Sequence, residues 1–306
     1  MISVILPTYN NGAYLDDVVQ SYLQQDLSDA SEILVIDDGS SDDTAQVLTK
    51  FDDPKLRIIR FIERQGVISA RNAGMREARG DLLVFSVGDA VVPENYLQNY
   101  ETLLSSDDVD GIVGPTKITV DDSPDLFVRY LNRNRSPAQY TKTPLPPEYV
   151  TFTNLGIRRE LIARAGLFDT DFHGYGGHEM EYAHRLVREQ YGRFFYAEEV
   201  ATFRQRYRTF PQTREKFYQF GLTNLPLLLR RYPEYKRLYK VQLYEAAPVI
   251  TAALVKILDG FLRFLIPVNE EGHVGGWLRI KPGFVQFWFL KMALGLAILR
   301  GYVEKD

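Results

Sequence analysis

The sequence contains no cysteine and only four histidines and two tryptophans in 306 residues. The lack of cysteine excludes disulfide frameworks and thiolate-bound zinc or iron–sulfur sites, so the fold must be stabilised by packing. A length of 306 residues allows one large or two modest domains, and the 45% apolar content is enough for a sizeable core. The stretch Met1–Pro7 shows neither a basic start nor a cleavage site, which argues against a signal peptide and for a cytoplasmic protein.

Two glycine-rich signatures of common nucleotide-binding folds are also missing. No GxGxxG follows the first apolar run, and no GxxxxGK[ST] occurs anywhere in the chain. Dinucleotide-dependent dehydrogenases and P-loop ATPases are therefore disfavoured, because both need these turns to approach phosphate closely.

Positive charge is concentrated in one segment although the formal net charge is −4. Residues 204–240 hold ten lysines and arginines against two glutamates. Such a stretch needs either solvent or an anionic neighbour. A nucleotide diphosphate, an anionic bilayer and a phosphate-bearing acceptor are the three candidates for that neighbour. Nucleic acid is disfavoured, because no recognition motif accompanies the charge.

The first hundred residues alternate between two patterns. Short β-branched, apolar runs predict strands at Ile2–Leu6, Ile33–Ile36, Arg57–Phe61 and Leu82–Phe85. Helical spacing of apolar residues predicts helices at 14–23, 42–51 and 67–79. This alternation is typical of a parallel sheet flanked by helices, whose ligands bind beyond the carboxyl ends of the strands. The loops at 7–9, 37–39 and 88–89 are expected to share that edge.

The middle of the chain is less regular. Residues 121–147 carry five prolines and predict a linker or mobile segment over the site. A glycine-rich turn at 174–177 leads into a predicted helix at 179–191.

Two apolar segments near the C-terminus predict long helices. The first, Val249–Ile266, places Lys256, Asp259 and Arg263 on one face, which a membrane-spanning helix rarely does. The second, Phe284–Leu299, would be roughly 24 Å long, short of the ~30 Å hydrocarbon core. We expect both helices to lie in the plane of a membrane interface, although a cap on the first domain or a contact between copies stays open.

Five motifs occur in a fixed order: Val4-Ile-Leu-Pro-Thr-Tyr-Asn10, Val35-Ile-Asp-Asp-Gly-Ser-Ser-Asp-Asp-Thr44, Gly66-Val-Ile-Ser-Ala-Arg-Asn-Ala-Gly-Met-Arg-Glu-Ala-Arg-Gly-Asp81, Gly166-Leu-Phe-Asp169 and Tyr218-Gln-Phe-Gly221. Together with the segment Gly174–Leu186, they closely resemble family 2 glycosyltransferases from residue 2 to about 222. The resemblance implies an α/β GT-A fold, which is a Rossmann-like, mostly parallel sheet flanked by helices. It also implies a nucleotide-sugar (donor) half at 1–110, an acceptor-binding and catalytic half at 111–222, and a helical extension at 223–306, in which a membrane-interfacial role is open.

The resemblance also assigns residues to the donor site. Asp38 would accept the ring N–H of uracil, and its alternative role is to cap the following turn. Arg71 would neutralise phosphate, and the alternative is that it is an ordinary surface arginine. The expected donor-binding residues are Pro7, Thr8, Tyr9, Asp38, Arg71, Asn72, Gly88 and Asp89.

The reaction implied is inverting sugar transfer, in which one carboxylate takes the proton of the acceptor hydroxyl. Members of the family usually carry an acidic pair, and counting back from Arg185 gives Glu179 as the base while His178 replaces the first acid. Capping of the helix is the alternative role of Glu179. The expected acceptor-binding residues are Asn154, His173, Gly177 and His178, although a structural role for each histidine stays open.

The metal site departs from the family pattern. The usual DxD becomes Val87-Gly-Asp89, and Phe203 stands near the position of a ligating histidine. Asp89 alone could still hold Mg²⁺ or Mn²⁺ with phosphate and water. Alternatively, Arg71 or the arginines at 204–208 could replace the metal in part, or activity could be weak or lost.

The sequence therefore predicts a transferase that uses a nucleotide-diphosphate sugar, with UDP favoured, on a glycan or lipid-linked acceptor. It predicts a peripheral position on the cytoplasmic face of a membrane and no nucleic-acid partner. A homo-oligomer stays open. The alternative is a non-catalytic or weakly active binding or scaffolding protein that has lost the usual metal site.

Overall fold

The computed structural model describes residues 1–25, 31–119, 125–134, 137, 140 and 142–305, which form two compact units. The sheet unit comprises Met1–Thr119, Arg135–Thr170 and Glu179–Arg206. The helical unit comprises Val120–Asn134, Asp171–His178 and Tyr207–Asp306. The predicted division at residues 110 and 222 concerns donor and acceptor roles, and it stays a prediction.

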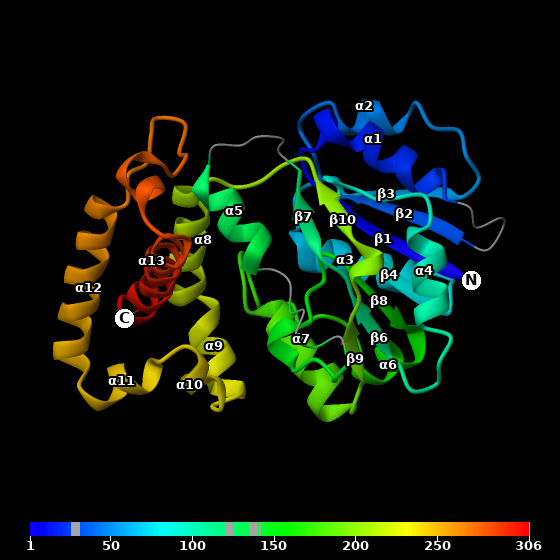
Figure 1. Cartoon of the computed structure of the whole chain (residues 1–306). Helices are drawn as coiled ribbons and strands as arrows, with labels where there is room; N and C mark the ends of the chain where they lie inside the picture. Colours follow the sequence, from blue (N-terminus) through cyan, green and yellow to red (C-terminus); the bar gives the residue numbers. More distant parts are fainter. Residues whose placement is uncertain (26–30, 120–124, 135–136, 138–139, 141, 306) are drawn as a thin grey trace. The chain divides into compact units, whose positions relative to one another are not determined.

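A seven-stranded sheet forms the centre of the sheet unit (Figure 1). Its order is β3 (Leu56–Arg60), β2 (Ser31–Asp37), β1 (Ile2–Thr8), β4 (Leu82–Phe85), β8 (Leu155–Arg158), β6 (Gly111–Val113) and β9 (Phe194–Tyr196). Strands β3, β2, β1 and β4 are parallel, and only β8 runs antiparallel to its neighbours. The predicted α/β class with a mostly parallel sheet is confirmed, and all four predicted strands are present.

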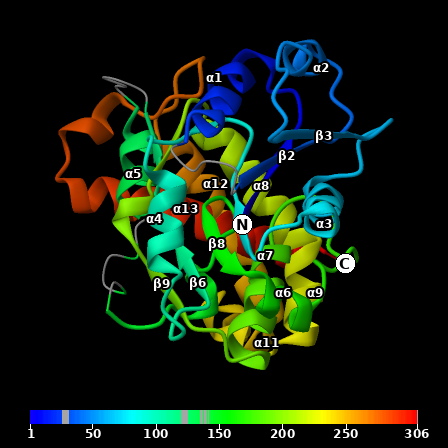
Figure 2. The same ribbon diagram turned by 90° about the vertical axis from the view of Figure 1, so that its right-hand side faces the viewer.

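Helices cover both faces of this sheet. Val4 and Leu6 of β1 belong to one core cluster with residues of α1 (Gly12–Leu23) and α4 (Tyr96–Leu103). Ile5 points to the other face, towards α3 (Val67–Glu77), where a Cβ on Gly74 would lie 2.6 Å from Ile5 Cγ2. Figures 1 and 2 show α1 and α3 on opposite sides of the strands. Successive residues of a strand point to opposite faces, which explains why β1 is apolar along most of its length.

A second, three-stranded sheet holds the chain beside the end of β4. Its order is β5 (Ala90–Val91), β10 (Thr202–Arg204) and β7 (Thr116–Ile118). Arg204 pairs with Ala90 in the antiparallel register, and the next backbone N–H, of Gln205, donates to the carbonyl of Asp89 at 2.9 Å. The end of β10 is therefore fixed next to Asp89.

The predicted linker at 121–147 is wrong over residues 126–134, where α5 (Leu126–Asn134) forms. The five prolines all lie outside this helix, and its buried residues Leu126, Phe127 and Leu131 supply an apolar face. Asp125 accepts the N–H of Phe127 at 2.9 Å at the helix start. Residues 120–124, 135–136, 138–139 and 141 lie outside the described residues.

Two other predicted helices differ in length. The helix predicted at 42–51 is reduced to α2 (Thr44–Leu48). The helix predicted at 179–191 is α7 (His178–His184) followed by a π-helical turn (Arg185–Glu189). The remaining helix of the sheet unit is α6 (Arg159–Ala165).

The helical unit contains α5, α8 (Phe210–Leu222), α9 (Asn224–Arg231), α10 (Tyr235–Leu238), α11 (Val241–Ala246), α12 (Pro248–Leu265) and α13 (Gly283–Val303). Helix α13 lies between α8 and α12 (Figure 1). Glycines allow α8 and α13 to approach closely, because a Cβ on Gly221 would collide with the carbonyl of Ile298 and a Cβ on Gly301 with that of Tyr218.

The length predicted for the last helix is wrong. Helix α13 has 21 residues, which at 1.5 Å per residue is about 32 Å. Among the described residues it is the one helix whose length and apolar composition would allow it to cross a membrane. This is weak support for a membrane span, because buried helices of soluble proteins share these properties.

Helix α12 buries one of its charged residues, Asp259. Asp259 is fully buried and forms ion pairs with Arg214 of α8, with Arg300 of α13 and with Arg263 one turn further along α12. Burial lowers the pKa of Arg214 and outweighs the opposing effect of Asp259. Of the stripe expected from the sequence, Asp259 therefore joins three helices, whereas the side chains of Lys256 and Arg263 are 54% and 49% exposed.

The opposite side of α12 is apolar and exposed. Each of its members is between 45% and 84% exposed: Val249, Ile250, Leu254, Ile257, Leu258, Phe261 and Phe264. Five of them follow one another at intervals of three or four residues, which is the spacing of a single helical face. We call these seven residues the outer face of α12.

The close approach of α8 and α13 generates a stability prediction. Gly301→Ala should lower the free energy of unfolding by about 1–3 kcal/mol, because its Cβ would overlap the Tyr218 carbonyl. Gly295→Ala in the same helix meets no atom within 4 Å and should instead be stabilising by up to about 1 kcal/mol. Urea unfolding of both variants checks this, and equal effects would contradict the packing described.

Candidate functional site

The loops that follow β1, β2 and β4 meet at the carboxyl edge of the sheet. The backbone N–H of Asp38 donates to the carbonyl of Thr8 at 2.9 Å. A Cβ on Gly88 would lie 2.6 Å from Thr8 Oγ1, so only glycine allows the third loop this close. Pro7 is buried inside β1, paired with Ile36, and its side chain is not available to a ligand at this edge.

Asp38 anchors the turn before α3. Its carboxylate accepts the backbone N–H groups of Gln65 at 2.7 Å and Gly66 at 2.9 Å. Gly66 has a φ of 93°, a conformation that favours glycine. Asp38 is 4% exposed, but a carboxylate offers about four acceptor positions, so it retains capacity for a further donor. Its expected contact with uracil stays a prediction.

An aromatic–cation pair lies beside Asp38. The guanidinium of Arg64 stacks over the ring of Tyr9, 4.2 Å from the ring centre, and Arg64 Nε lies 3.9 Å from Asp38 Oδ2. Arg64 is not among the residues expected from the sequence. It could have been found from its position just after β3, whose carboxyl end lies at the same edge of the sheet.

Glu179 is held by a buried arginine. Arg71 Nη2 lies 2.7 Å from Glu179 Oε1 and donates to the Phe152 carbonyl at 3.0 Å. Arg71 is 2% exposed, whereas the Glu179 side chain is 27% exposed. The expected exposure of Arg71 to phosphate is therefore not found, because its guanidinium orients Glu179 and lies in the interior.

Asn72, expected to contact the donor, is also internal. Its side chain accepts the N–H of Phe168 and donates to the carbonyl of the same residue, both at 2.9 Å. It is 2% exposed. Asn72 therefore fixes the loop that carries Phe168 against α3, and its amide is not open to a nucleotide.

The same correction applies to Asn154, expected to bind the acceptor. Its Oδ1 accepts the hydroxyls of Tyr96 and Tyr100, both at 2.7 Å. Its Nδ2 donates to the carbonyls of Pro115 at 3.0 Å and Val200 at 2.7 Å. Asn154 has no exposed surface, and its amide is fully engaged by these four partners.

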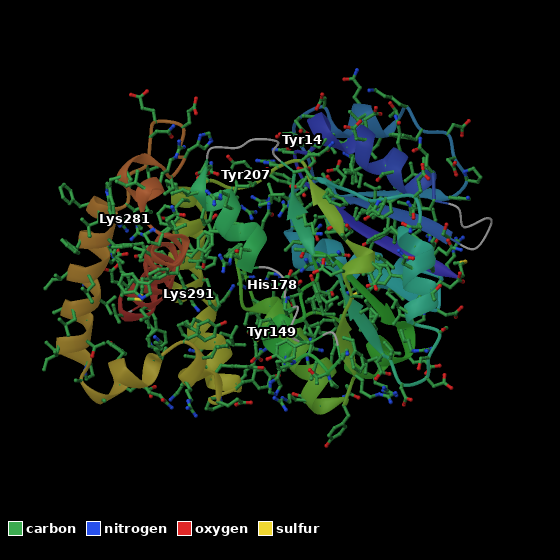
Figure 3. The ribbon with its side chains drawn as sticks, viewed as in Figure 1. Tyr14, Tyr149, His178, Tyr207, Lys281 and Lys291 are labelled. Carbon is green, nitrogen blue, oxygen red and sulfur yellow. The ribbon has the colours of Figure 1, made fainter. Side chains whose placement is uncertain are left out.

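The other expected acceptor residues lie in the helical unit, whereas Glu179 lies in the sheet unit. Asn224 holds their turn by accepting the N–H of His173 at 3.3 Å and donating to the carbonyl of Gly176 at 2.8 Å. His173 is exposed, and Gly177 has a φ of 82°. His178, labelled in Figure 3 at the start of α7, is 7% exposed.

Asp89 forms a two-pronged ion pair with Arg204. Arg204 Nε donates to Asp89 Oδ1 at 3.0 Å, and Nη2 donates to Oδ2. The side chains are 5% and 17% exposed. Removing one partner of such a buried pair costs about 3–5 kcal/mol, because it leaves an uncompensated charge. Arg204 is thus the ion-pair partner of Asp89, and the pairing of β10 with β5 holds Arg204 next to this aspartate.

The residues around Asp89 do not fit a resident Mg²⁺ or Mn²⁺ ion. Val87 and Phe203 carry no ligating atom, and both carboxylate oxygens of Asp89 are bonded to Arg204. Within the described ranges, no group of three or more histidines, aspartates and glutamates could hold a metal. The metal contact expected for Asp89 therefore requires a different arrangement from the one observed.

Comparison with solved structures identifies the fold. A mannosyltransferase from Pyrobaculum calidifontis, PcManGT, in complex with GDP-Man and Mn²⁺, superposes with a TM-score of 0.65 at 20% identity, covering 98% of this chain and 86% of that one. TarS 1–349 from S. aureus in complex with UDP-GlcNAc gives a TM-score of 0.56 at 15% identity, covering 98% of this chain and 89% of that one. The fold is GT-A.

The family follows from the sequence. The profile described as "Glycosyl transferase family 2" matches residues 3–166, more than half of the chain, and the chain belongs to this family. Chondroitin synthase from Escherichia coli is 23% identical over 224 residues, covering 61% of this chain and 32% of that protein. This chain spans less than two thirds of the length of the curated relatives that it matches.

The internal position of Asn154 generates the prediction for this site. Asn154→Leu should lower the free energy of unfolding by about 2–5 kcal/mol, because two tyrosine hydroxyls and two carbonyls lose their partner. His173→Ala, at an exposed position, should change it by less than about 0.5 kcal/mol. Chemical denaturation checks both variants. An Asn154→Leu protein of unchanged stability would contradict the structural role of this amide.

Proposed function

We propose that this chain transfers a sugar from a nucleotide-diphosphate sugar, with UDP as the favoured nucleotide, to a hydroxyl of a glycan or lipid-linked acceptor. Family membership supports sugar transfer, and the solved neighbours carry UDP-GlcNAc or GDP-Man. The observation that carries the proposal is that Asp38, Asp89 and Glu179, far apart in sequence, all belong to the sheet unit, and that the loops of Asp38 and Asp89 meet at Thr8.

The donor nucleoside is assigned to the loops after β1 and β2. The ring of Tyr9, covered on one face by Arg64, lies next to the Asp38 carboxylate, and the buried residues Thr8 and Gly88 support the adjoining backbone. An aromatic ring beside an acceptor suits a base with a ring N–H, which uracil has. The diphosphate then extends towards Asp89 and Arg204.

Glu179 is the proposed general base of an inverting reaction. The acceptor oxygen attacks the anomeric carbon as the bond from that carbon to the diphosphate oxygen breaks, and the electron pair leaves with the diphosphate. The hydroxyl proton passes to Glu179. Arg71 is a positioning residue in this scheme, because it holds Oε1 of Glu179. Glu179 Oε2 accepts the backbone N–H of Phe152 at 3.5 Å, and the side chain is 27% exposed.

This assignment predicts a separation of turnover from binding. Glu179→Gln should lower transfer by at least about 100-fold while leaving the Kd for UDP within about twofold, since the base acts only in the reaction. Glu160→Gln, at an exposed position of α6, is the matched control and should leave both unchanged. Both are measured with a panel of UDP-sugars and by calorimetry.

The rival function, a non-catalytic binding or scaffolding protein, is favoured by the missing ligands at Val87 and Phe203. UDP binding without transfer from any sugar of the panel would support this rival. Transfer that survives Glu179→Gln would remove Glu179 as the base and leave the transferase assignment intact.

We further propose that the helical unit docks on the cytoplasmic face of an anionic membrane as a peripheral surface. The outer face of α12 is apolar and exposed, whereas Asp259, on another side of this helix, is buried in ion pairs with Arg214 and Arg300. Phe284 and Trp288 of α13 are further exposed aromatic side chains of this unit. Lys281 and Lys291, labelled in Figure 3, are exposed in the same segment of the chain.

This composition favours lipid over a second copy of the chain. Aromatic residues combined with lysine are typical of surfaces that lie at the boundary of headgroups and acyl chains, where lysine meets anionic lipid. A peripheral position would bring a lipid-linked acceptor to the enzyme.

The membrane proposal predicts co-sedimentation with vesicles that contain phosphatidylglycerol. Replacing Ile257 and Phe261 together by aspartate should weaken this binding by more than about tenfold, because both side chains would leave the acyl boundary. Ile62→Asp, at a fully exposed apolar residue of the sheet unit, is the control and should bind as the parent does. Parent protein that stays in the supernatant, or that dimerises through α12 by light scattering, would contradict the proposal.

A further inference from the structure

We propose that the guanidinium of Arg204 does, at the donor diphosphate, what a divalent cation does in metal-dependent glycosyltransferases, so that this protein binds its nucleotide without metal. The inference rests on the proposed function and deepens it, because it assigns the cation that meets the diphosphate. It starts from one observation: both oxygens of the single acidic residue left in the metal motif, Asp89, are bonded to Arg204.

The backbone fixes this pairing. Arg204 lies opposite Ala90 in the ladder between β10 and β5, and the N–H of Gln205 bonds to the Asp89 carbonyl at 2.9 Å. The two-pronged contact uses Nε and one terminal nitrogen, which holds the plane of the guanidinium in one orientation. Both the backbone and the guanidinium of Arg204 are therefore held in place at this edge of the sheet.

The charges of the site also balance. Two carboxylates and one divalent cation sum to zero in a DxD site, and one carboxylate with one guanidinium sums to zero here. Val87 stands where a DxD motif has its first aspartate, so one negative charge is missing. Arg204 supplies one positive charge where a divalent cation would supply two. The donor diphosphate therefore meets a site of the same net charge as a DxD site with its divalent cation.

Arg204 keeps hydrogen-bond donors for an anion. Among the residues that the structure describes, its second terminal nitrogen, Nη1, donates no hydrogen bond, and its side chain is 17% exposed. Asp89 follows Gly88, which touches Thr8 of the proposed nucleoside site. Arg206, two residues further along, donates to the Asn10 carbonyl at 3.4 Å and adds a second cation to the same edge.

The role of Arg204 in transfer follows from this position. As the bond between the anomeric carbon and the diphosphate breaks, negative charge grows on the departing oxygen. A fixed guanidinium compensates that charge without the reorganisation that solvent would need. The proton balance is unchanged, because the acceptor proton still passes to Glu179.

The experiment is calorimetric titration of the full chain with UDP and separately with GDP, in excess EDTA and in excess MnCl2. The parent protein should bind its nucleotide with a Kd that differs by less than about twofold between the two conditions. In EDTA, Arg204→Gln should weaken binding by more than about tenfold, and Arg204→Lys by less, because lysine keeps the charge and loses the fork. Arg188→Gln, an exposed arginine of the sheet unit, is the control of equal charge and should bind as the parent does.

The parent comparison needs no variant, so it stands even if Arg204→Gln unfolds. Binding that requires Mn²⁺, or an Arg204→Gln protein that binds normally in EDTA, would overturn the role of Arg204 and leave the proposed function in place. Failure of both nucleotides in both conditions would overturn the proposed function and this inference with it.

Discussion

The parallel pairing of β1 with β2 and β4 is the constraint on which the site depends. Ile5 lies beside Leu34 on one side and Phe85 on the other, so all three strands end at one edge of the sheet. Helices bury both faces of β1, which leaves this edge as the place where polar loops can be gathered. Thr8, Asp38 and Gly88 meet there because of strand register, whatever ligand they bind.

Three acids of this molecule that are buried or partly buried form ion pairs with arginines. Arg71 holds Glu179, Arg204 holds Asp89, and Arg214 and Arg300 hold Asp259. An isolated buried carboxylate is costly, so each pair restricts where its members can lie. The same electrostatic rule therefore positions the proposed base, fixes Asp89 against Arg204 and turns Asp259 of α12 towards α8 and α13.

Much of the fold could be predicted from the sequence, because it is encoded locally. Uniform β-branched runs identify buried parallel strands, and the helical spacing of apolar residues identifies α1 and α3. The polar residues Asn72, Arg71 and Asn154 could not be judged this way. Asn72 bonds to Phe168 and Asn154 to Val200, and sequence spacing does not reveal which polar atoms find partners so far along the chain.

The orientation of α12 illustrates the same limit. Its periodicity separates a charged side from an apolar side, but which side faces inward depends on Arg214 and Arg300 in two other helices. Helix α5 was hidden for a different reason. Prolines surround it, and its nine residues are stabilised by burial and not by length.

The most direct test of the account is anomalous diffraction at the manganese edge from crystals grown with UDP and MnCl2. The account predicts nucleotide density with the diphosphate beside Arg204 and no manganese peak within about 2.5 Å of Asp89. A manganese peak bonded to Asp89, with Arg204 turned away, would contradict it.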